Sequence, residues 1–411
     1  MMSARRRFIA AGLALSAAAL MRSARAAAIT ALRPESLAGI PVRLQSFVDA
    51  GTIAGAVYHV QQQGAIIASG AVGWRDLGSR SPMHSDTLFQ VMSQSKPFIA
   101  TAILMLEDER RLNVEDPVDR YLPEFADPWL LSAGDASERQ LRRPSRKITI
   151  ADVLSHCSGL PDAAPVTRAF AVKMRMSLAE VVGLLSQQPL EAEPGVRWRY
   201  SNQGIAVAAR IVEVVAGMPF ERYVEERIFA PLGMAQSSYR PAPESWPRLA
   251  SCYELVDGRL REMGPASPGG GDLKYRRNTR YPLPEAGIFS TAADMARFHQ
   301  LIVNGGRWGG ATILSPRAMD SLLEPRIAIP AGNGSPAGLQ ALGWRVQPAL
   351  PPSARRSLPL GAGAIHHGGA FGSFGWVDRA NELVGIFLVQ RPNALAERDA
   401  FVAAVDSALT H

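Results

Sequence analysis

Residues 89–97 read Phe89-Gln90-Val91-Met92-Ser93-Gln94-Ser95-Lys96-Pro97, and an apolar stretch with helical periodicity continues from them to residue 112. Residues three apart lie on one face of a helix, so a helix that begins here brings the Ser93 hydroxyl beside the Lys96 amine. Unpaired N–H groups at a helix start favour a developing oxyanion, and a proline is tolerated in the first turn. The stretch therefore predicts a serine nucleophile with an amine next to it.

Lys96 is expected to be partly removed from water, because Phe98, Ile103 and Leu106 place apolar groups around it, and such burial lowers the pKa of an amine toward a value useful for a base. The chain has four lysines, and none of the other three follows a serine by three residues. One Ser-x-x-Lys still arises by chance in roughly one chain of four, so the pattern needs support from further motifs.

The stretch around Ser93 resembles the first motif of the serine β-lactamases and penicillin-binding proteins, above all the class C-related branch that includes the family VIII carboxylesterases. Two further motifs follow in the order that this family shows. Pro194–Asn202 contains a Tyr-x-Asn motif, and Gly363–Ala370 contains a His-x-Gly form of the third motif. Blocks at 148–160, 231–234 and 287–294 also match, so the resemblance covers nearly the whole chain after residue 28.

The resemblance and the periodicity predict an α/β (α+β) fold with two subdomains. Apolar, β-prone runs at 54–72 and 374–389 form two hairpins, and helical spacing follows at 396–409. Helical periodicity fills the middle, at 97–112, 150–154, 178–185 and 205–215. We expect an antiparallel sheet built from both chain ends and flanked by helices (29–92 plus 286–411), with an inserted, mainly helical part (93–285). Residues 126–146, 264–284 and 327–363 are predicted to be long loops.

By resemblance, Ser93 is the nucleophile that forms an acyl-enzyme, with Lys96 and Tyr200 as its catalytic partners. Which of the two is the general base is left open. Asn202 has two possible roles, which do not exclude each other. Its amide is directed toward Lys96 or the substrate, or it caps the helix that follows. His156 is expected to be structural.

The third motif is expected on an edge strand that lines the cleft, with His367, Gly368, Gly369 and Ala370 in contact with substrate. Glycines let a substrate approach the backbone closely. The resemblance implies that the N–H groups of Ala370 and Ser93 form the oxyanion hole. Strand neighbours alternate, so His366 should point to the opposite face from His367.

Most β-lactamases and transpeptidases of this family carry Lys-Thr-Gly at the third motif, where the cation helps to hold the β-lactam carboxylate. His367 is mostly neutral near pH 7 at its ordinary pKa of about 6.5. The substitution favours uncharged esters or amides, unless Arg276, Arg277 or Arg280 supplies the charge.

Composition excludes several other classes of protein. The chain has 411 residues, of which 47% are hydrophobic and 20% charged, so it is neither disordered nor fibrous. No His-Glu-x-x-His or Cys-x-x-Cys pattern occurs, so no metal and no cofactor is expected. Without five arginines in residues 1–28, the formal net charge falls from +7 to +2, which gives no reason to expect nucleic acid as a partner.

Residues 1–28 are predicted to be a signal peptide. Arg5-Arg6-Arg7 precedes an apolar run of about 14 residues, too short to span a bilayer, and small residues then offer cleavage sites. The order resembles a twin-arginine signal. We therefore expect a periplasmic or secreted protein without a stable membrane anchor, and the sequence leaves the oligomeric state open.

These observations predict an exported serine hydrolase, most simply a carboxylesterase on small esters. A β-lactamase or a D-amino peptide hydrolase (carboxypeptidase) of the same fold is the first alternative, so the expected partner is a small ester, amide or β-lactam. A non-catalytic cell-wall-binding or scaffold protein is the alternative from another class.

Overall fold

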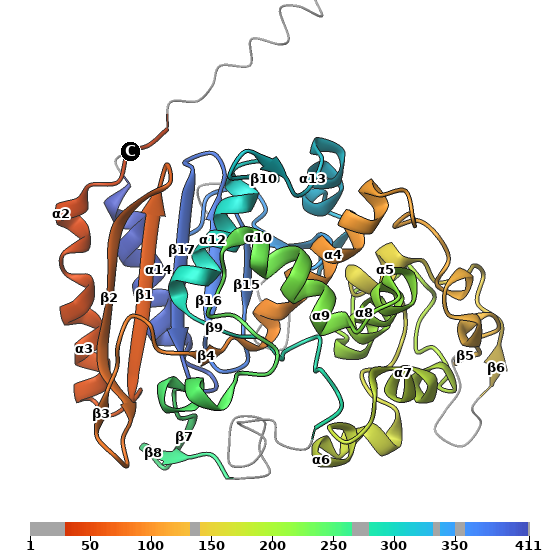
Figure 1. Cartoon of the computed structure of the whole chain (residues 1–411), viewed down its shortest axis with the longest axis horizontal. Coiled ribbons are helices and arrows are strands. Elements are labelled where there is room, and N and C mark those ends of the chain that lie inside the picture. The colour runs from red at the N-terminus through yellow and green to blue at the C-terminus, as the bar shows by residue number, and fades with distance from the viewer. Residues whose placement is uncertain (1–28, 132–139, 265–278, 332–337, 350–357, 410–411) are drawn as a thin grey trace, which may run out of the picture.

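The computed structural model describes residues 29–131, 140–264, 279–331, 338–349 and 358–409 (Figure 1). The predicted signal peptide at 1–28 lies outside the described residues, and so do Arg276, Arg277 and parts of the predicted loops.

A nine-stranded antiparallel sheet forms the centre of the fold, in the order β12-β13-β14-β15-β16-β17-β1-β2-β3. β1 (Gly55–Gln62) pairs with β2 (Ala65–Asp76) on one side and with β17 (Leu383–Val389) on the other. β17 continues into β16 (Phe374–Asp378) and β15 (Ile365–Gly368), and β3 (Ser81–Pro82) closes the far edge. The sheet therefore joins both ends of the chain, which confirms the predicted architecture and both predicted hairpins.

The prediction of a single long loop at 327–363 is wrong. β12 (Ile327–Ile329), β13 (Gly338–Gln340) and β14 (Arg345–Val346) lie in this stretch and extend the sheet beyond β15. Strands of two or three residues are too short for periodicity to reveal, and pairing with their neighbours holds them in place. As a result β15 lies between β14 and β16, so the third motif is not on an edge strand as predicted.

Helices cover both faces of the sheet (Figure 1). Tyr58 and Phe387 pack on one face with α2 (Pro34–Leu37), α3 (Ile40–Asp49) and α14 (Leu395–Ala408). Val57 and Ile386, one residue along each strand, belong to the cluster on the other face, where α12 (Ala292–Val303) packs. This alternation is the period of two expected for strands that are buried on both faces.

The helical part is built around α4 (Lys96–Asp108), in which every residue from Lys96 to Leu106 is buried. It packs against α8 (Asn202–Ala216), α9 (Phe220–Val224) and α13 (Pro316–Leu323). The predicted helix at 97–112 ends early because Arg110 adopts a left-handed φ of 58°. The other predicted helices occur as α5 (Ile150–Leu154), α7 (Leu178–Ser186) and α8, and 396–409 corresponds to α14.

The remaining elements are short. Small strand pairs join β4 (Phe89–Gln90) to β9 (Phe289–Ser290), β5 (Leu130–Leu131) to β6 (Leu141–Arg142), β7 (Tyr253–Val256) to β8 (Arg259–Glu262) and β10 (Arg307–Trp308) to β11 (Ala311–Thr312). Short helical segments are η1 (Met92–Ser95), η2 (Val118–Arg120), η3 (Pro123–Phe125), η4 (Pro165–Arg168), α6 (Phe170–Lys173), η5 (Glu225–Phe229), α10 (Ala230–Leu232) and η6 (Pro243–Arg248).

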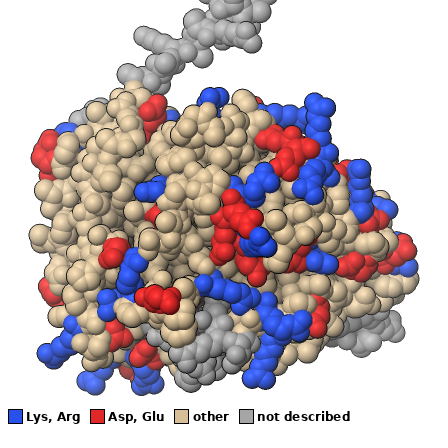
Figure 2. All heavy atoms as spheres, in the orientation of Figure 1, with Lys and Arg blue, Asp and Glu red and all other residues tan. Residues whose placement is uncertain are grey.

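Three further features bear on the predictions. Cys157 and Cys252 are buried and do not form a disulfide with each other. On the face seen in Figure 2, acidic and basic side chains are interspersed. Within the described residues no single helix is long and apolar enough to cross a membrane, while one strongly bent pair, α8 with the segment 220–232, meets the criterion of length and composition.

Stability should fall as the solution is acidified, and buried His299 should contribute to the fall. Burial lowers the pKa of His299 on α12 to about 4, its Nδ1 lies 2.7 Å from the Met295 carbonyl oxygen, and its Nε2 has no hydrogen-bond partner among the described residues. Unfolded histidine titrates near 6.5, so between about pH 6.5 and 4 the unfolded chain binds more protons. We expect His299→Gln to reduce the loss of unfolding free energy between pH 7 and pH 5 by about 2 kcal/mol, measured by urea denaturation.

His84 is exposed, so His84→Gln is the matched control and should leave the difference between the two pH values as in the wild type. Equal pH dependence for His299→Gln and the wild type would contradict the prediction.

Candidate active site

Ser93 and Lys96 meet at the start of α4. Met92–Ser95 form the 3₁₀ turn η1, in which residues i and i+3 eclipse, and Lys96 is the first residue of α4. Lys96 Nζ donates hydrogen bonds to Ser93 Oγ and to the Glu285 backbone carbonyl, each at 2.9 Å. The predicted juxtaposition of Ser93 and Lys96 is present, and Lys96 is the residue at which the α-helix begins.

The backbone before Ser93 is held in an uncommon conformation. Met92 has a φ of 54°, in the left-handed region that residues other than glycine seldom adopt. Ser95 Oγ donates to the Met92 carbonyl at 2.7 Å and accepts from the Ile288 N–H at 3.2 Å, which secures the turn. Such strain persists where the surroundings enforce it, and it is common at functional sites.

Tyr200 completes the group of three side chains predicted from sequence. The Lys96 Nζ lies 4.8 Å from the centroid of the Tyr200 ring, and the His156 ring packs on Tyr200 with centroids 4.5 Å apart. His156 Nδ1 accepts a hydrogen bond from the Ser201 N–H at 3.2 Å. Burial, with Lys96 nearby, lowers the pKa of His156 to about 3. His156 is therefore a neutral ring that supports Tyr200, which fits the expected structural role.

Asn202 does not cap α8. Ser201 is the N-cap, because its Oγ accepts the Gly204 N–H at 3.0 Å, so the alternative role of Asn202 as a cap is wrong. Asn202 is the first helical residue, and its N–H donates to Asp162 Oδ1 at 2.9 Å. It is not one of the described residues that line the cavity beside Ser93.

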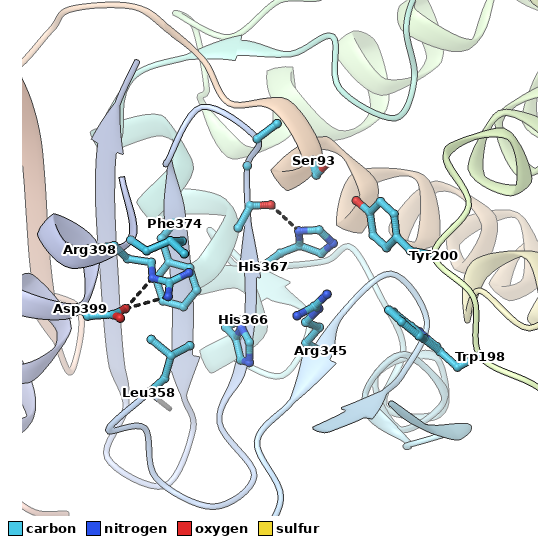
Figure 3. Close-up of a pocket in the computed structure, with 14 residues that line it drawn as sticks. Ser93, Trp198, Tyr200, Arg345, Leu358, His366, His367, Phe374, Arg398 and Asp399 are labelled. Atoms are coloured by element: carbon cyan, nitrogen blue, oxygen red, sulfur yellow. Dashed lines mark hydrogen bonds and ion pairs between the residues drawn. The ribbon is translucent and has the colours of Figure 1, made fainter. Parts of the chain in front are cut away.

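The two histidines of the third motif, His366 and His367, are neighbours on β15, and both line the cavity beside Ser93. In β15, His367 stands opposite Gly375 and His366 opposite Trp376. His367 Nδ1 lies 2.8 Å from the Gly368 carbonyl oxygen, and its ring is directed toward Tyr200 in Figure 3. Burial, reinforced by Lys96, holds the pKa of His367 well below its ordinary range. The third motif therefore presents an uncharged imidazole near neutral pH.

Only glycine fits at position 369. A Cβ there would lie far inside van der Waals contact with Ser373 Oγ and the Val91 carbonyl oxygen. Ser373 Oγ donates to the same Val91 carbonyl at 2.9 Å, so the end of β15 rests directly on the segment that leads to Ser93. The Ala370 N–H next to it donates to no acceptor among the described residues.

Gly369→Ala should therefore displace the end of β15 from Val91. We expect a loss of about 1–3 kcal/mol in unfolding free energy, as for an overpacked core, and slower labelling of Ser93 by a fluorophosphonate. Urea denaturation and intact mass measured over time provide the two readouts.

Gly368→Ala is the matched control. A Cβ at Gly368 would make its nearest contact at 3.6 Å, with the Phe374 ring, which is an ordinary van der Waals distance. If Gly369→Ala and Gly368→Ala lower the unfolding free energy and the labelling rate equally, close contact with Val91 is not the reason that position 369 requires glycine.

A buried ion pair fixes the carbonyl that holds Lys96. Glu285 Oε1 accepts a hydrogen bond from Lys173 Nζ at 2.5 Å, and Oε2 accepts one from the Tyr281 hydroxyl at 3.1 Å. Both charged side chains are buried. Sequence reasoning missed this group because Lys173 and Glu285 are 112 residues apart and carry no motif.

Removal of one partner leaves the other charge buried. We expect Glu285→Gln to lower the unfolding free energy by about 3–5 kcal/mol, because Lys173 then lacks its carboxylate. The exposed Arg222–Glu226 pair is the matched comparison, and Glu226→Gln should have little effect on stability because water screens this pair. Urea denaturation measures both, and similar costs for the two variants would contradict the prediction.

A cavity of about 610 Å³ opens beside Ser93 (Figure 3). Every residue that was predicted for the site lines it except Asn202 and Lys96, which is buried behind Ser93. Sequence reasoning missed Trp198, which lies in the quoted second motif, and several residues of the C-terminal part. The lining residues are Ser93, Trp198, Tyr200, Arg345, Leu358, His366, His367, Gly368, Gly369, Ala370, Phe374, Leu395, Arg398 and Asp399.

The charges in the cavity come from residues that we did not predict. Arg345 on β14 and the Arg398–Asp399 ion pair line it, whereas Arg280 pairs with Glu180 and does not. Within the described ranges no cluster of three His, Cys, Asp or Glu side chains could hold a metal ion.

A serine and a lysine in hydrogen-bond contact, with a tyrosine beside them and a sheet strand against them, define a serine hydrolase of the β-lactamase fold. The family model described as Beta-lactamase matches residues 43–408, so the chain belongs to that family. The family is one of enzymes, which argues against the non-catalytic scaffold.

The relatives agree with this membership. Esterase EstB of Burkholderia gladioli is 28% identical over 382 residues, which cover 85% of this chain and 91% of EstB. Protein Rv1367c of Mycobacterium tuberculosis is 28% identical over 385 residues, covering 90% and 94% of the two chains. The solved structure of EstCE1, a hydrolase with promiscuous acyltransferase activity, superposes with a TM-score of 0.76 at 24% identity and covers 91% of this chain and 99% of its own. This likeness confirms the predicted fold.

Proposed function

We propose that the protein is an exported carboxylesterase that hydrolyses small esters through an acyl-enzyme on Ser93. The observation that carries the proposal is the 2.9 Å hydrogen bond between Lys96 Nζ and Ser93 Oγ at the floor of the cavity. A hydroxyl becomes an effective nucleophile when an adjacent base takes its proton. Lys96 Nζ lies within hydrogen-bond distance of the Ser93 hydroxyl, close enough for a proton to pass between the two groups.

The reaction then follows from the positions of the groups. Ser93 Oγ attacks the ester carbonyl carbon and gives its proton to Lys96 or Tyr200. The N–H groups of Ser93 and Ala370 stabilise the oxyanion of the tetrahedral intermediate. Its collapse breaks the bond to the alcohol oxygen, which takes up the proton, and leaves the acyl group on Ser93. Water attacks the acyl-enzyme in the same way and releases the acid.

Two observations favour esters over β-lactams. His367 occupies the position where most β-lactamases and transpeptidases carry a lysine, so β15 itself supplies no charge, and the cation that lines the cavity, Arg345, lies on the neighbouring strand instead. EstB, which aligns along most of this chain, is named an esterase. Export is proposed from residues 1–28 alone. Hydrolysis of β-lactams or of D-amino peptides uses the same acyl-enzyme and is the alternative that the assay must separate.

Treatment of the purified protein with a fluorophosphonate should add one adduct mass, and Ser93→Ala should remove it. Lys96→Ala and Tyr200→Phe should each lower kcat/KM for 4-nitrophenyl butyrate by about 10²–10⁴, the range for loss of a general acid or base. Intact mass spectrometry and release of 4-nitrophenol are the measurements.

Two further substrates separate the alternatives. Turnover of a chromogenic cephalosporin, or release of D-alanine from a D-alanyl-D-alanine peptide, at a kcat/KM above that of the ester would replace the esterase by a β-lactamase or a carboxypeptidase. The absence of an adduct on the wild-type protein would contradict the nucleophile itself.

A further inference from the structure

The cavity beside Ser93 carries one uncompensated positive charge. Its lining includes a single carboxylate, Asp399, which accepts hydrogen bonds from Arg398 at 2.7–2.8 Å. His366 and His367 are neutral near pH 7, because burial lowers the pKa of His366 to about 3 and that of His367 well below its ordinary range. Arg345 remains, and no carboxylate in the described part of the chain lies within ion-pair distance of it.

Arg345 is held on a rigid part of the structure. Its backbone lies in β14, opposite Gln340 of β13 and His366 of β15. Its guanidinium carbon lies 5.9 Å from the centroid of the Trp198 ring, and Trp198 Nε1 donates to Gln340 Oε1 at 3.3 Å. Figure 3 shows the side chain between the two histidines and Trp198, directed toward the end of the cavity where Tyr200 lies. An aromatic wall beside a guanidinium orients its donors.

The guanidinium of Arg345 is partly removed from water and has no carboxylate as a counterion among the described residues. The residue is half-buried, and burial lowers its pKa, an effect that Tyr200 opposes and Arg398 reinforces. A guanidinium does not deprotonate in proteins, so the charge persists. A partly dehydrated cation without a counterion gains free energy when a carboxylate binds it, and the fork of Arg donors matches the two oxygens of that group.

Resting on the proposed function, we infer that Arg345 binds a carboxylate carried by the substrate, so that the preferred esters are monoesters of dicarboxylic acids or esters of hydroxy acids. The positive charge that His367 does not provide on β15 comes from the neighbouring strand β14. The apolar side chains of Leu358, Phe374 and Leu395 line the same cavity and accommodate the carbon chain of such a substrate.

Two matched pairs of esters test the inference. In the first pair, 4-nitrophenyl hemiglutarate carries a carboxylate on its acyl half and 4-nitrophenyl valerate carries none. In the second pair, 4-acetoxybenzoate carries the carboxylate on its alcohol half, and methyl 4-acetoxybenzoate is the neutral counterpart. We expect the wild type to prefer the anionic member of at least one pair in kcat/KM by roughly 10- to 100-fold, as for hydrogen bonds to a charged group. The preference should weaken between 0.02 M and 0.5 M NaCl.

Arg345→Gln should remove that preference, and Arg345→Lys should retain part of it. The exposed Arg222→Gln changes the net charge equally and should keep the wild-type ratio. If the wild type does not prefer the anionic ester in either pair, the inference is overturned. An equal loss on the anionic and neutral esters in Arg345→Gln would also overturn it, since Arg345 would then act through Tyr200.

A binding measurement separates this inference from the proposed function. Calorimetric titration of 4-nitrophenyl hemiglutarate and of 4-acetoxybenzoate into Ser93→Ala should show binding of at least one of the two anions that Ser93→Ala/Arg345→Gln lacks, whether or not the wild type turns the ester over. Equal binding to the two variants, or no binding to either, would overturn the inference. If Arg345→Gln does not fold, the wild-type preference and its salt dependence decide.

Discussion

The active site depends on a lysine buried at the start of a buried helix. Lys96 has no exposed surface, and burying an ammonium without partners would be prohibitively costly. Two acceptors offset the cost, Ser93 Oγ and the Glu285 carbonyl. The position of the Glu285 carbonyl is fixed by the side chain of the same residue. The Glu285 carboxylate accepts hydrogen bonds from Lys173 and Tyr281 inside the protein. The direction of the Lys96 amine therefore depends on Ser93 in its own turn and on two distant parts of the chain, Lys173 and the segment 281–285.

A second constraint acts on the other side of the nucleophile. The end of β15 rests on the Val91 carbonyl through Ser373, and the tight contact leaves room only for glycine at 369. Met92 adopts its left-handed conformation in the same short segment. The serine turn is thus held between the sheet and α4. Catalysis by oriented N–H groups requires this kind of rigidity, because the donors must be in place before charge develops.

The charge that the cavity offers a substrate does not lie on the third motif itself. The third motif carries a neutral histidine, and Arg345 stands on the next strand. Because the cation lies on β14 and not on β15, a substrate must place its negative charge near Arg345 and its ester carbonyl near Ser93 at the same time. The inference about carboxylate-bearing esters follows from this displacement.

The central motifs could be predicted from sequence because their chemistry is local. Ser93 and Lys96 are three residues apart on one turn, and Tyr200 and His367 lie in motifs that can be recognised one at a time. Both hairpins and the helices α4, α5, α7, α8 and α14 followed from apolar periodicity, whereas α3, α12 and α13 were not predicted. The strands at 327–346 escaped prediction because they are too short to show a period and form only by pairing with neighbours. Asn202 was assigned a possible cap that Ser201 provides, since Asn and Ser are equally good caps and the choice depends on where the helix starts.

The sequence by itself therefore determined the class of chemistry and the order of the elements, because both follow from neighbours along the chain. Only the tertiary structure decided which charges face the cavity. Arg345 and the Lys173–Glu285 pair have no local signature, and their roles arise from contacts between residues far apart in sequence. Long-range packing sets the dehydration and pairing of such groups, and these determine what a charged side chain can bind.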